Sequence, residues 1–117
     1  MNMLLIVNSD LSSVGRNVQK LIENLENDIY ALFISAHLQG DPSTTSMILS
    51  FHNMRPTAPI FVIYDQTRFT FKEFFKEFED RILPPIKAYL PRPINDKKII
   101  DQVGADIKSK VDLWLVF

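Results

Sequence analysis

The chain has no cysteine and only three glycines, Gly15, Gly40 and Gly104. The absence of cysteine excludes disulfide bonds, thiol catalysis and zinc sites built from thiolates. With so few glycines, the sequence holds neither a Walker motif nor a Gly-x-Gly-x-x-Gly motif, so we expect no phosphate-binding loop for a nucleotide. Long hydrophobic runs are also missing, because none approaches the roughly 18 apolar residues of a membrane-spanning helix.

The sequence also lacks an excess of either charge. Its 117 residues include 13 basic and 14 acidic side chains, for a formal net charge of −1. This balance provides no global field for nucleic acid or an anionic membrane, and the few lysines near the C-terminus are too sparse for a nucleic-acid face. The apolar run at 3–7 has no basic stretch before it and ends at Asn8, which predicts a strand rather than a signal peptide. We therefore expect a cytoplasmic protein that contacts neither nucleic acid nor membrane.

What is present is an alternation of strands and helices, in a length that suits a single domain over residues 1–117. Short apolar runs predict strands at 3–7, 29–34, 60–64 and 86–90. Helical spacing predicts helices from Ser12 or Ser13 to about Asn27, at 44–54, from Phe71 to Ile82, and from Asn95 or Asp96 through Ile107. The apolar tail at 111–116 is either a fifth strand or the end of the last helix.

This pattern predicts an α/β fold, a three-layer α/β/α sandwich of the flavodoxin-like or receiver-like kind. Its sheet would be parallel, with four to five strands. In such a sheet the loops that follow the strands gather at one edge, where binding and chemistry collect. The polar residues predicted at that edge are, in chain order, Asn8, Ser9, Asp10, Ser35, His37, Tyr64, Asp65 and Arg92.

Two segments at that edge carry a resemblance to a known family. The opening Leu4-Leu5-Ile6-Val7-Asn8-Ser9-Asp10 resembles the first strand and acidic corner of response-regulator receivers. The segment Ala88-Tyr89-Leu90-Pro91-Arg92-Pro93-Ile94 is similar to their Ala-Tyr-Leu-x-Lys-Pro motif, with Arg92 in the lysine position. The interval from Ser35 to Tyr64 also suits the receiver step from the phosphoacceptor to the Thr/Ser position.

The departures from the receiver pattern bear on function. Asn8 and Ser9 replace the acidic pair, Ser35 replaces the phosphoacceptor aspartate, and Tyr64 stands at the Thr/Ser position. Phosphoryl transfer to a carboxylate needs that acceptor and a Mg²⁺ ion held by oxygen ligands. Serine does not replace aspartate without an activating base. The resemblance therefore implies a pseudo-receiver, a bacterial domain of two-component signal transduction that is no enzyme and acts through protein-protein contacts.

The same resemblance leaves two points open. Arg92 is either a remnant of the receiver lysine, paired with Asp10, or a solvated loop residue. The interval between Asn8 and Ser35 is too short for the complete strand-helix unit that a receiver has there. Either this unit is absent, or the second strand lies at the edge of the sheet and residues 111–116 supply a fifth strand.

A related resemblance implies a different role. The opening segment and Ala58-Pro59-Ile60-Phe61-Val62-Ile63-Tyr64-Asp65 are similar to the receiver-like N-terminal wing domain of inducible ornithine, lysine and arginine decarboxylases. Those wings serve assembly and are not catalytic. This resemblance implies an assembly domain at the front of a longer, pyridoxal-phosphate-dependent protein.

A small-molecule sensor or enzyme is the competing class of function. It would use the loop crevice at Asp10, Ser35, His37 and Asp65. Ser35 and His37 share a strand face and can contact each other as nucleophile and base, but no Gly-x-Ser-x-Gly elbow surrounds Ser35. The pattern therefore favours two polar loop residues. Asp10, Asp41 and Asp65 can also converge on a metal ion, although turn and cap roles explain each separately, and we expect neither metal nor cofactor.

A stripe of phenylalanines gives a candidate contact surface. Five of the nine phenylalanines fall within ten residues, at Phe69, Phe71, Phe74, Phe75 and Phe78. Core packing is the simpler explanation, yet one helix on a small sheet rarely buries so many rings. An exposed remnant of the stripe would mark an interface with a protein partner, with an attached output domain, or with a second copy in a homodimer.

Overall fold

The computed structural model describes residues 2–24, 28–38, 40–68, 70–79 and 83–117. Its sheet has five parallel strands in the order β4-β3-β2-β1-β5. The strands are β1 (Asn2–Val7), β2 (Asp28–Ser35), β3 (Ile60–Tyr64), β4 (Ala88–Pro91) and β5 (Leu113–Val116). Within the described residues, none of the helices is long and apolar enough to cross a membrane.

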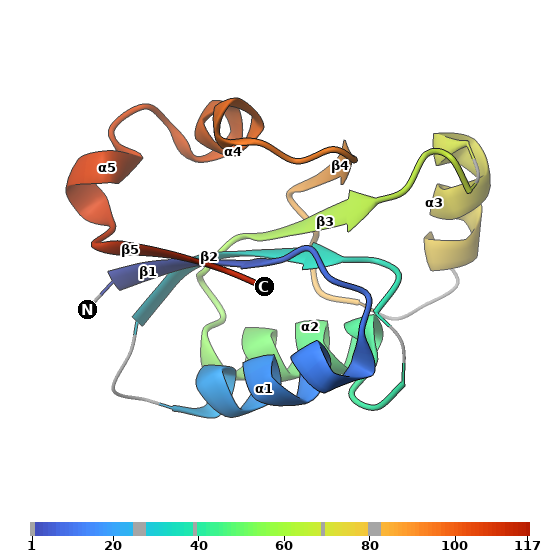
Figure 1. Cartoon of the computed structure of the whole chain (residues 1–117), viewed down its shortest axis with the longest axis horizontal. Coiled ribbons are helices and arrows are strands. Elements are labelled where there is room, and N and C mark those ends of the chain that lie inside the picture. Colours follow the sequence, from blue (N-terminus) through green and yellow to red (C-terminus); the bar gives the residue numbers. More distant parts are fainter. Residues whose placement is uncertain (1, 25–27, 39, 69, 80–82) are drawn as a thin grey trace.

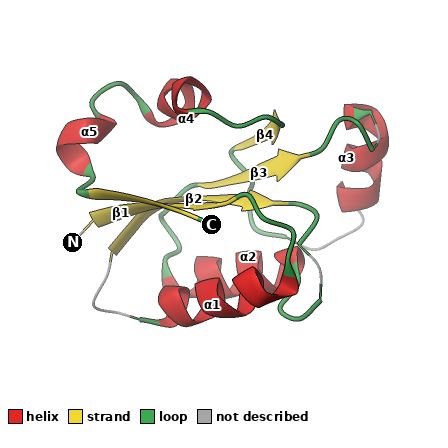
Figure 2. Ribbon diagram, in the orientation of Figure 1, coloured by secondary structure: helices red, strands yellow, loops and turns green. Residues whose placement is uncertain are grey.

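Helices cover both faces of this sheet. The helices are α1 (Ser12–Glu23), α2 (Thr44–Met54), α3 (Phe71–Glu79), α4 (Asp96–Val103) and α5 (Ile107–Lys110). Figure 1 shows α1 and α2 below the sheet and α4 and α5 above it, while α3 stands beyond the end of β3. The three layers are clearest when helices and strands are coloured separately (Figure 2). The predicted three-layer, flavodoxin-like α/β fold is therefore confirmed.

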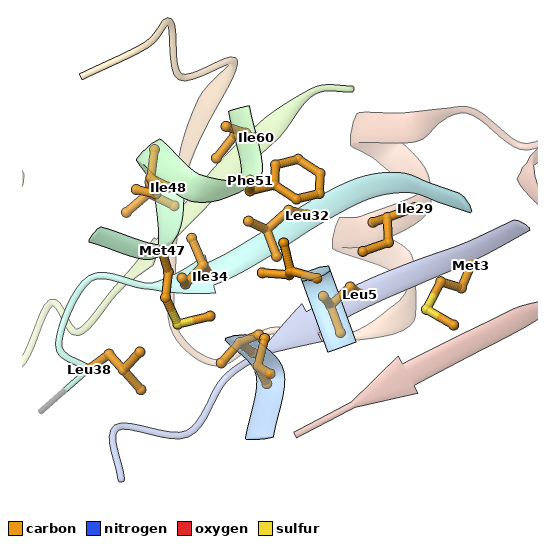
Figure 3. Close-up of a cluster of buried hydrophobic side chains, with 14 of the residues drawn as sticks. Met3, Leu5, Ile29, Leu32, Ile34, Leu38, Met47, Ile48, Phe51 and Ile60 are labelled. Carbon is orange, nitrogen blue, oxygen red and sulfur yellow. The ribbon is translucent and has the colours of Figure 1, made fainter. Parts of the chain in front are cut away.

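The central strands are apolar at nearly every position because both of their faces are covered. Successive side chains of a strand point to opposite faces. In β1, Leu5 and Val7 join the core between the sheet and helices α1 and α2. Leu4 and Ile6 join the core on the other face, between the sheet and helices α4 and α5. Figure 3 shows the first of these cores, where Met47 and other side chains of α2 pack on the sheet.

The second core is organised around one aromatic pair. Phe33 of β2 stacks on Phe61 of β3 with ring centroids 4.4 Å apart and planes 10° from parallel. Both rings are fully buried. Ile99 of α4 and Ile107 of α5 complete this core from above, so the pair ties two neighbouring strands to the helices that cover them.

The strand order decides between the two alternatives for the short first interval. β2 pairs directly with β1 and does not lie at an edge, so the shifted arrangement is wrong on that point. Among the described residues, no strand intervenes between β1 and β2. The tail forms a fifth strand as one alternative predicted, and β5 pairs with the free side of β1. It occupies the edge that the second strand takes in the flavodoxin-like order 2-1-3-4-5.

Two predicted helices differ from the structure in detail. The last helix is divided into α4 and α5, because Gly104 adopts φ +100°, a conformation that interrupts a helix. The first helix has Leu11 at its N-cap and no side-chain cap, so the prediction of a serine cap was wrong. Ser9 is bonded differently, since its Oγ accepts from the Leu11 amide at 3.2 Å. The predicted cap at Asn95 is confirmed by its bond from the Lys98 amide.

The aromatic pair in the second core allows a test of the fold. Phe33→Ala removes a fully buried ring and leaves Phe61 without its stacking partner. We expect the free energy of unfolding to fall by about 3–5 kcal/mol, measured by urea denaturation. Leu49→Ala is the control, because Leu49 is 41% exposed on α2 and should change stability by less than about 0.5 kcal/mol. Similar small losses in both variants would contradict this arrangement.

Candidate functional site

Four loops meet at the carboxyl edge of the sheet. There the side chain of Arg92 forms hydrogen bonds with three residues, Asn8, Asp10 and Ser35. The Arg92 side chain donates from Nε to Asn8 Oδ1 at 3.1 Å and from a terminal nitrogen to the Asn8 carbonyl at 2.6 Å. Its two terminal nitrogens contact both oxygens of Asp10, at 2.7 and 3.2 Å. One of them also donates to Ser35 Oγ at 2.9 Å. The predicted pairing of Arg92 with Asp10 is therefore present, and the guanidinium is not a solvated loop group.

The backbone of the loop that follows β4 positions Arg92 for these contacts. In the sheet, β3 and β2 lie between β4 and β1, so the side chain of Arg92 extends over the ends of these strands toward Asn8. The Arg92 amide donates to the Tyr64 carbonyl at 2.9 Å. Lys98 holds the loop from the other side, because its Nζ donates to the carbonyls of Pro91 and Pro93. Tyr64 thus contributes its backbone, while its buried side chain belongs to the core.

Ser35 has no exposed surface and its hydroxyl is fully engaged. Ser35 Oγ donates to Asp10 Oδ1 at 2.6 Å and accepts from Arg92 and from the His37 amide, the latter at 3.1 Å. One donor and two acceptor positions are all that a hydroxyl offers. The Ser35 carbonyl is also bonded, to the Thr44 hydroxyl at 2.7 Å. This serine is consequently a structural link and not an exposed nucleophile.

Asp10 is held in its ionised form. Burial by itself would raise the pKa of this carboxyl, but the hydrogen bonds from Arg92 and Ser35 outweigh burial and bring the pKa below its usual value. The bidentate contact with a planar guanidinium is the stronger kind of ion pair. At neutral pH the acidic corner therefore contains a carboxylate whose charge is already neutralised within the chain.

His37 is part of the same edge, but it does not act as a base on Ser35. The hydrogen bond between the two residues uses the His37 backbone amide. The imidazole Nε2 instead accepts from the Asp65 amide at 2.8 Å. A ring nitrogen that accepts a hydrogen bond carries no proton. Burial, and then the Arg68 guanidinium, lower the pKa of His37, so the neutral ring is the stable form.

Arg68 lies between two carboxylates of the site. Its guanidinium is 3.7 Å from Asp10 Oδ2 and 3.8 Å from Asp65 Oδ2. Asp65 has a turn role, because its Oδ1 accepts from the Thr67 amide and hydroxyl, and these bonds lower its pKa. The structure thus brings Asp10 and Asp65 to one arginine. Within the described residues no group of three potential ligands is arranged for a metal ion.

Two hollows lie near opposite ends of the strands. The one beside the site measures about 210 Å³ and is lined by His37, Thr44, Arg68 and their neighbours. A larger one, about 630 Å³, lies at the amino ends, where Asp28, Lys87 and residues near them form its wall. None of the predicted site residues lines the larger hollow.

The phenylalanine stripe is only partly described. Phe69 lies outside the described residues, and the side chains of Phe71 and Phe74 are likewise not described. Phe78 is only 4% exposed and belongs to the core on the side of the sheet covered by α1 and α2, as core packing predicts. Phe75 is 40% exposed and contacts Tyr89. Of the described side chains in this stripe, one is core and one is partly exposed.

Sequence reasoning missed three residues of the site. Arg68, Lys98 and Thr44 carried no motif, and each acts through a contact that only the fold creates. The single signal available for Arg68 was its place shortly after a predicted strand, next to the Asp65 turn.

Comparison of the chain with models of protein families, with curated proteins and with solved structures finds no match. Inferences about function therefore depend on the residues and contacts described above.

The central ion pair can be measured by a double-mutant cycle. Combining Arg92→Ala with Asp10→Asn should give a coupling energy of about 1 kcal/mol in urea unfolding, the value for a well-aligned pair with partial solvent access. Asp106, which precedes α5, and Lys110 at the end of α5 form an exposed pair at 2.8 Å and serve as the control cycle, where we expect a clearly smaller coupling. Equal coupling in both cycles would mean that the Arg92 network adds nothing beyond a surface ion pair.

His37 predicts a pH dependence of stability. Its folded pKa is lowered, whereas the unfolded value is about 6.5. As the pH falls through about 6.5, the unfolded chain binds a proton that the folded chain resists, so the free energy of unfolding decreases. His37→Gln keeps a possible acceptor for the Asp65 amide and should flatten this slope between about pH 7 and 5.5. The control variant His52→Gln, on α2, should retain the slope. If the slope is lost in His52→Gln and retained in His37→Gln, the assignment to His37 is wrong.

Proposed function

We propose that this chain is a receiver-like domain without the phosphorylation chemistry, which acts in regulation or signal transduction through protein-protein contacts. The observation that carries the proposal is the position of the Arg92 guanidinium on Asp10, Ser35 and Asn8. These are the residues that the receiver resemblance aligns with the acidic corner and the phosphoacceptor. A cation from the chain itself neutralises the place where a receiver requires Mg²⁺.

The state of Ser35 supports the same proposal. Its hydroxyl is buried and donates its proton to Asp10, a carboxylate that Arg92 keeps ionised. A carboxylate with a lowered pKa is a weak base, so Asp10 does little to activate the serine as a nucleophile. Phosphorylation of Ser35 would also have to break the contacts to Arg92 and the His37 amide.

The competing enzymatic function finds less support in the geometry. The crevice residues Ser35 and His37 do not form a nucleophile-base pair through the imidazole. Asp10 and Asp65 are both engaged by the chain's own donors. What remains is a small domain whose polar edge residues bond one another, and this favours work through its surfaces. An assembly domain of a larger protein would use its surfaces in the same way.

Incubation with Mg²⁺ and a small phosphodonor tests the proposal. We expect the chain to remain unlabelled by intact-mass spectrometry and the fluorescence of Trp114 to stay unchanged. A folded variant that restores the receiver residues, with Asn8→Asp, Ser9→Asp, Ser35→Asp and Arg92→Lys, should gain Mg²⁺-dependent labelling. Labelling of any residue in the unmodified chain would overturn the proposal, and a folded but inert variant would argue against the receiver relationship.

A further inference from the structure

The larger of the two hollows has the size and the lining of a small-molecule site. It measures about 630 Å³, and ligand pockets in proteins usually measure roughly 300–1,000 Å³. The first residues of β2, the loop between α2 and β3, Lys87 and the end of α4 surround it. More than half of its lining residues are apolar, among them Met54, Pro59 and Val103. An apolar lining with a few polar groups is typical of sites for small organic molecules.

One wall of this hollow is held in place by the chain itself. The Arg55 side chain donates to the carbonyls of Ile22 at 2.7 Å and of Asn24 at 3.3 Å. The Pro59 carbonyl accepts from the Leu32 amide at 3.1 Å. The loop between α2 and β3 is thereby tied to the end of α1 and to β2. The hollow is therefore formed without a ligand, as most ligand sites are.

Two opposite charges line the hollow and do not pair with each other. Asp28 begins β2, and Lys87 comes directly before β4. Among the described residues, neither side chain takes part in an ion pair. The Lys87 ammonium lies instead over the Phe61 ring, 6.0 Å from its centroid, which is a weak attraction at an exposed site. Both charges are thus available to a bound molecule.

The register of the strands indicates how far apart these charges lie. The Lys87 amide donates to the Ile60 carbonyl, and Ile60 pairs with Leu32 of β2. Asp28 precedes Leu32 by four residues, which is roughly 13 Å measured along the strands. Two extended residues span about 7 Å, and a hydrogen bond at each end adds about 3 Å. A dipeptide with free termini therefore matches the offset between the two charges.

We propose that the hollow at the amino ends of the strands binds an apolar dipeptide, with its carboxylate on Lys87 and its ammonium on Asp28. Thr57, Tyr30 and Gln102 also line the hollow and supply neutral donors and acceptors for the peptide group. The apolar part of the lining covers the two side chains of the ligand. A ligand with one charge would leave the other charge of the hollow without a partner, so a zwitterion is favoured.

This inference goes beyond the proposed function, and the two are tested separately. The hollow lies at the opposite end of the strands from the Arg92 network and shares no lining residue with it. A chain that is unlabelled by phosphodonor and binds no dipeptide would retain the proposed function and lose this site. A chain that is labelled and binds a dipeptide would do the reverse.

Nuclear magnetic resonance titration with three matched peptides tests the site. Leucyl-leucine carries both charges, N-acetyl-leucyl-leucine lacks the ammonium, and leucyl-leucinamide lacks the carboxylate. We expect leucyl-leucine to shift the backbone amides of Thr57, Lys87 and Gln102 and to bind at least ~5-fold more tightly than either analogue. Free leucine, which spans less of the hollow, should also bind more weakly.

Three results of this titration would overturn the proposal. The first is the absence of shifts at millimolar leucyl-leucine, or shifts confined to the carboxyl edge of the sheet. The second is equal binding of the three peptides, because the charges of the hollow would then play no part. The third is binding of free leucine as tight as that of leucyl-leucine, which would contradict the length of the ligand.

Two substitutions separate the roles of the charges. Lys87→Gln should abolish the advantage of leucyl-leucine over leucyl-leucinamide, because the carboxylate loses its partner, and should keep the advantage over the acetylated peptide. Asp28→Asn should have the converse effect. Both side chains are exposed, so we expect both variants to fold, which unchanged amide shifts away from the hollow would verify.

Lys97→Gln is the matched control for Lys87→Gln. It removes the same charge from an exposed position on α4, and Lys97 does not line the hollow. We expect its affinities for the three peptides to equal those of the unmodified chain. A Lys87→Gln variant that still prefers the free carboxylate, or a Lys97→Gln variant that loses this preference, would contradict the assignment of Lys87.

Discussion

Burial of a parallel sheet on both faces is the constraint from which the rest of this structure follows. Parallel strands need helices on either side, and β1, β2 and β3 are accordingly apolar at nearly every position. Two cores result, one between the sheet and helices α1 and α2 and one between the sheet and helices α4 and α5. Polar chemistry is therefore left to the loops at the strand ends.

The carboxyl edge shows how a site can keep its polar character and yet be closed to reaction. Asp10, Ser35 and Asn8 converge as strand geometry requires, but Arg92 supplies the positive charge that they would otherwise take from solution. Lys98 donates hydrogen bonds to backbone carbonyls of the loop that carries Arg92. Arg68 lies between the carboxylates of Asp10 and Asp65. The result is a network that ties the loop after β4 to the ends of β1 and β2.

The strand order places β5 beside this closed site. β5 takes the outer position next to β1, and its end is bonded to the loop that carries Asn8 and Ser9. The end of β5 therefore lies beside the Arg92 network, since Asn8 also bonds Arg92.

Much of the architecture could be predicted from residue patterns, since apolar runs and helical spacing are local properties. The positions of four strands and the cap at Asn95 follow from short segments. The meeting of Arg92 with Asp10 was one of two alternatives that the receiver resemblance left open, and the structure shows that pairing. Tertiary structure alone decided that β5 borders β1, that Gly104 divides the last helix, and that Ser35 bonds the His37 amide rather than its ring. These features depend on which distant segments compete for the same place in space, and no local pattern encodes that competition.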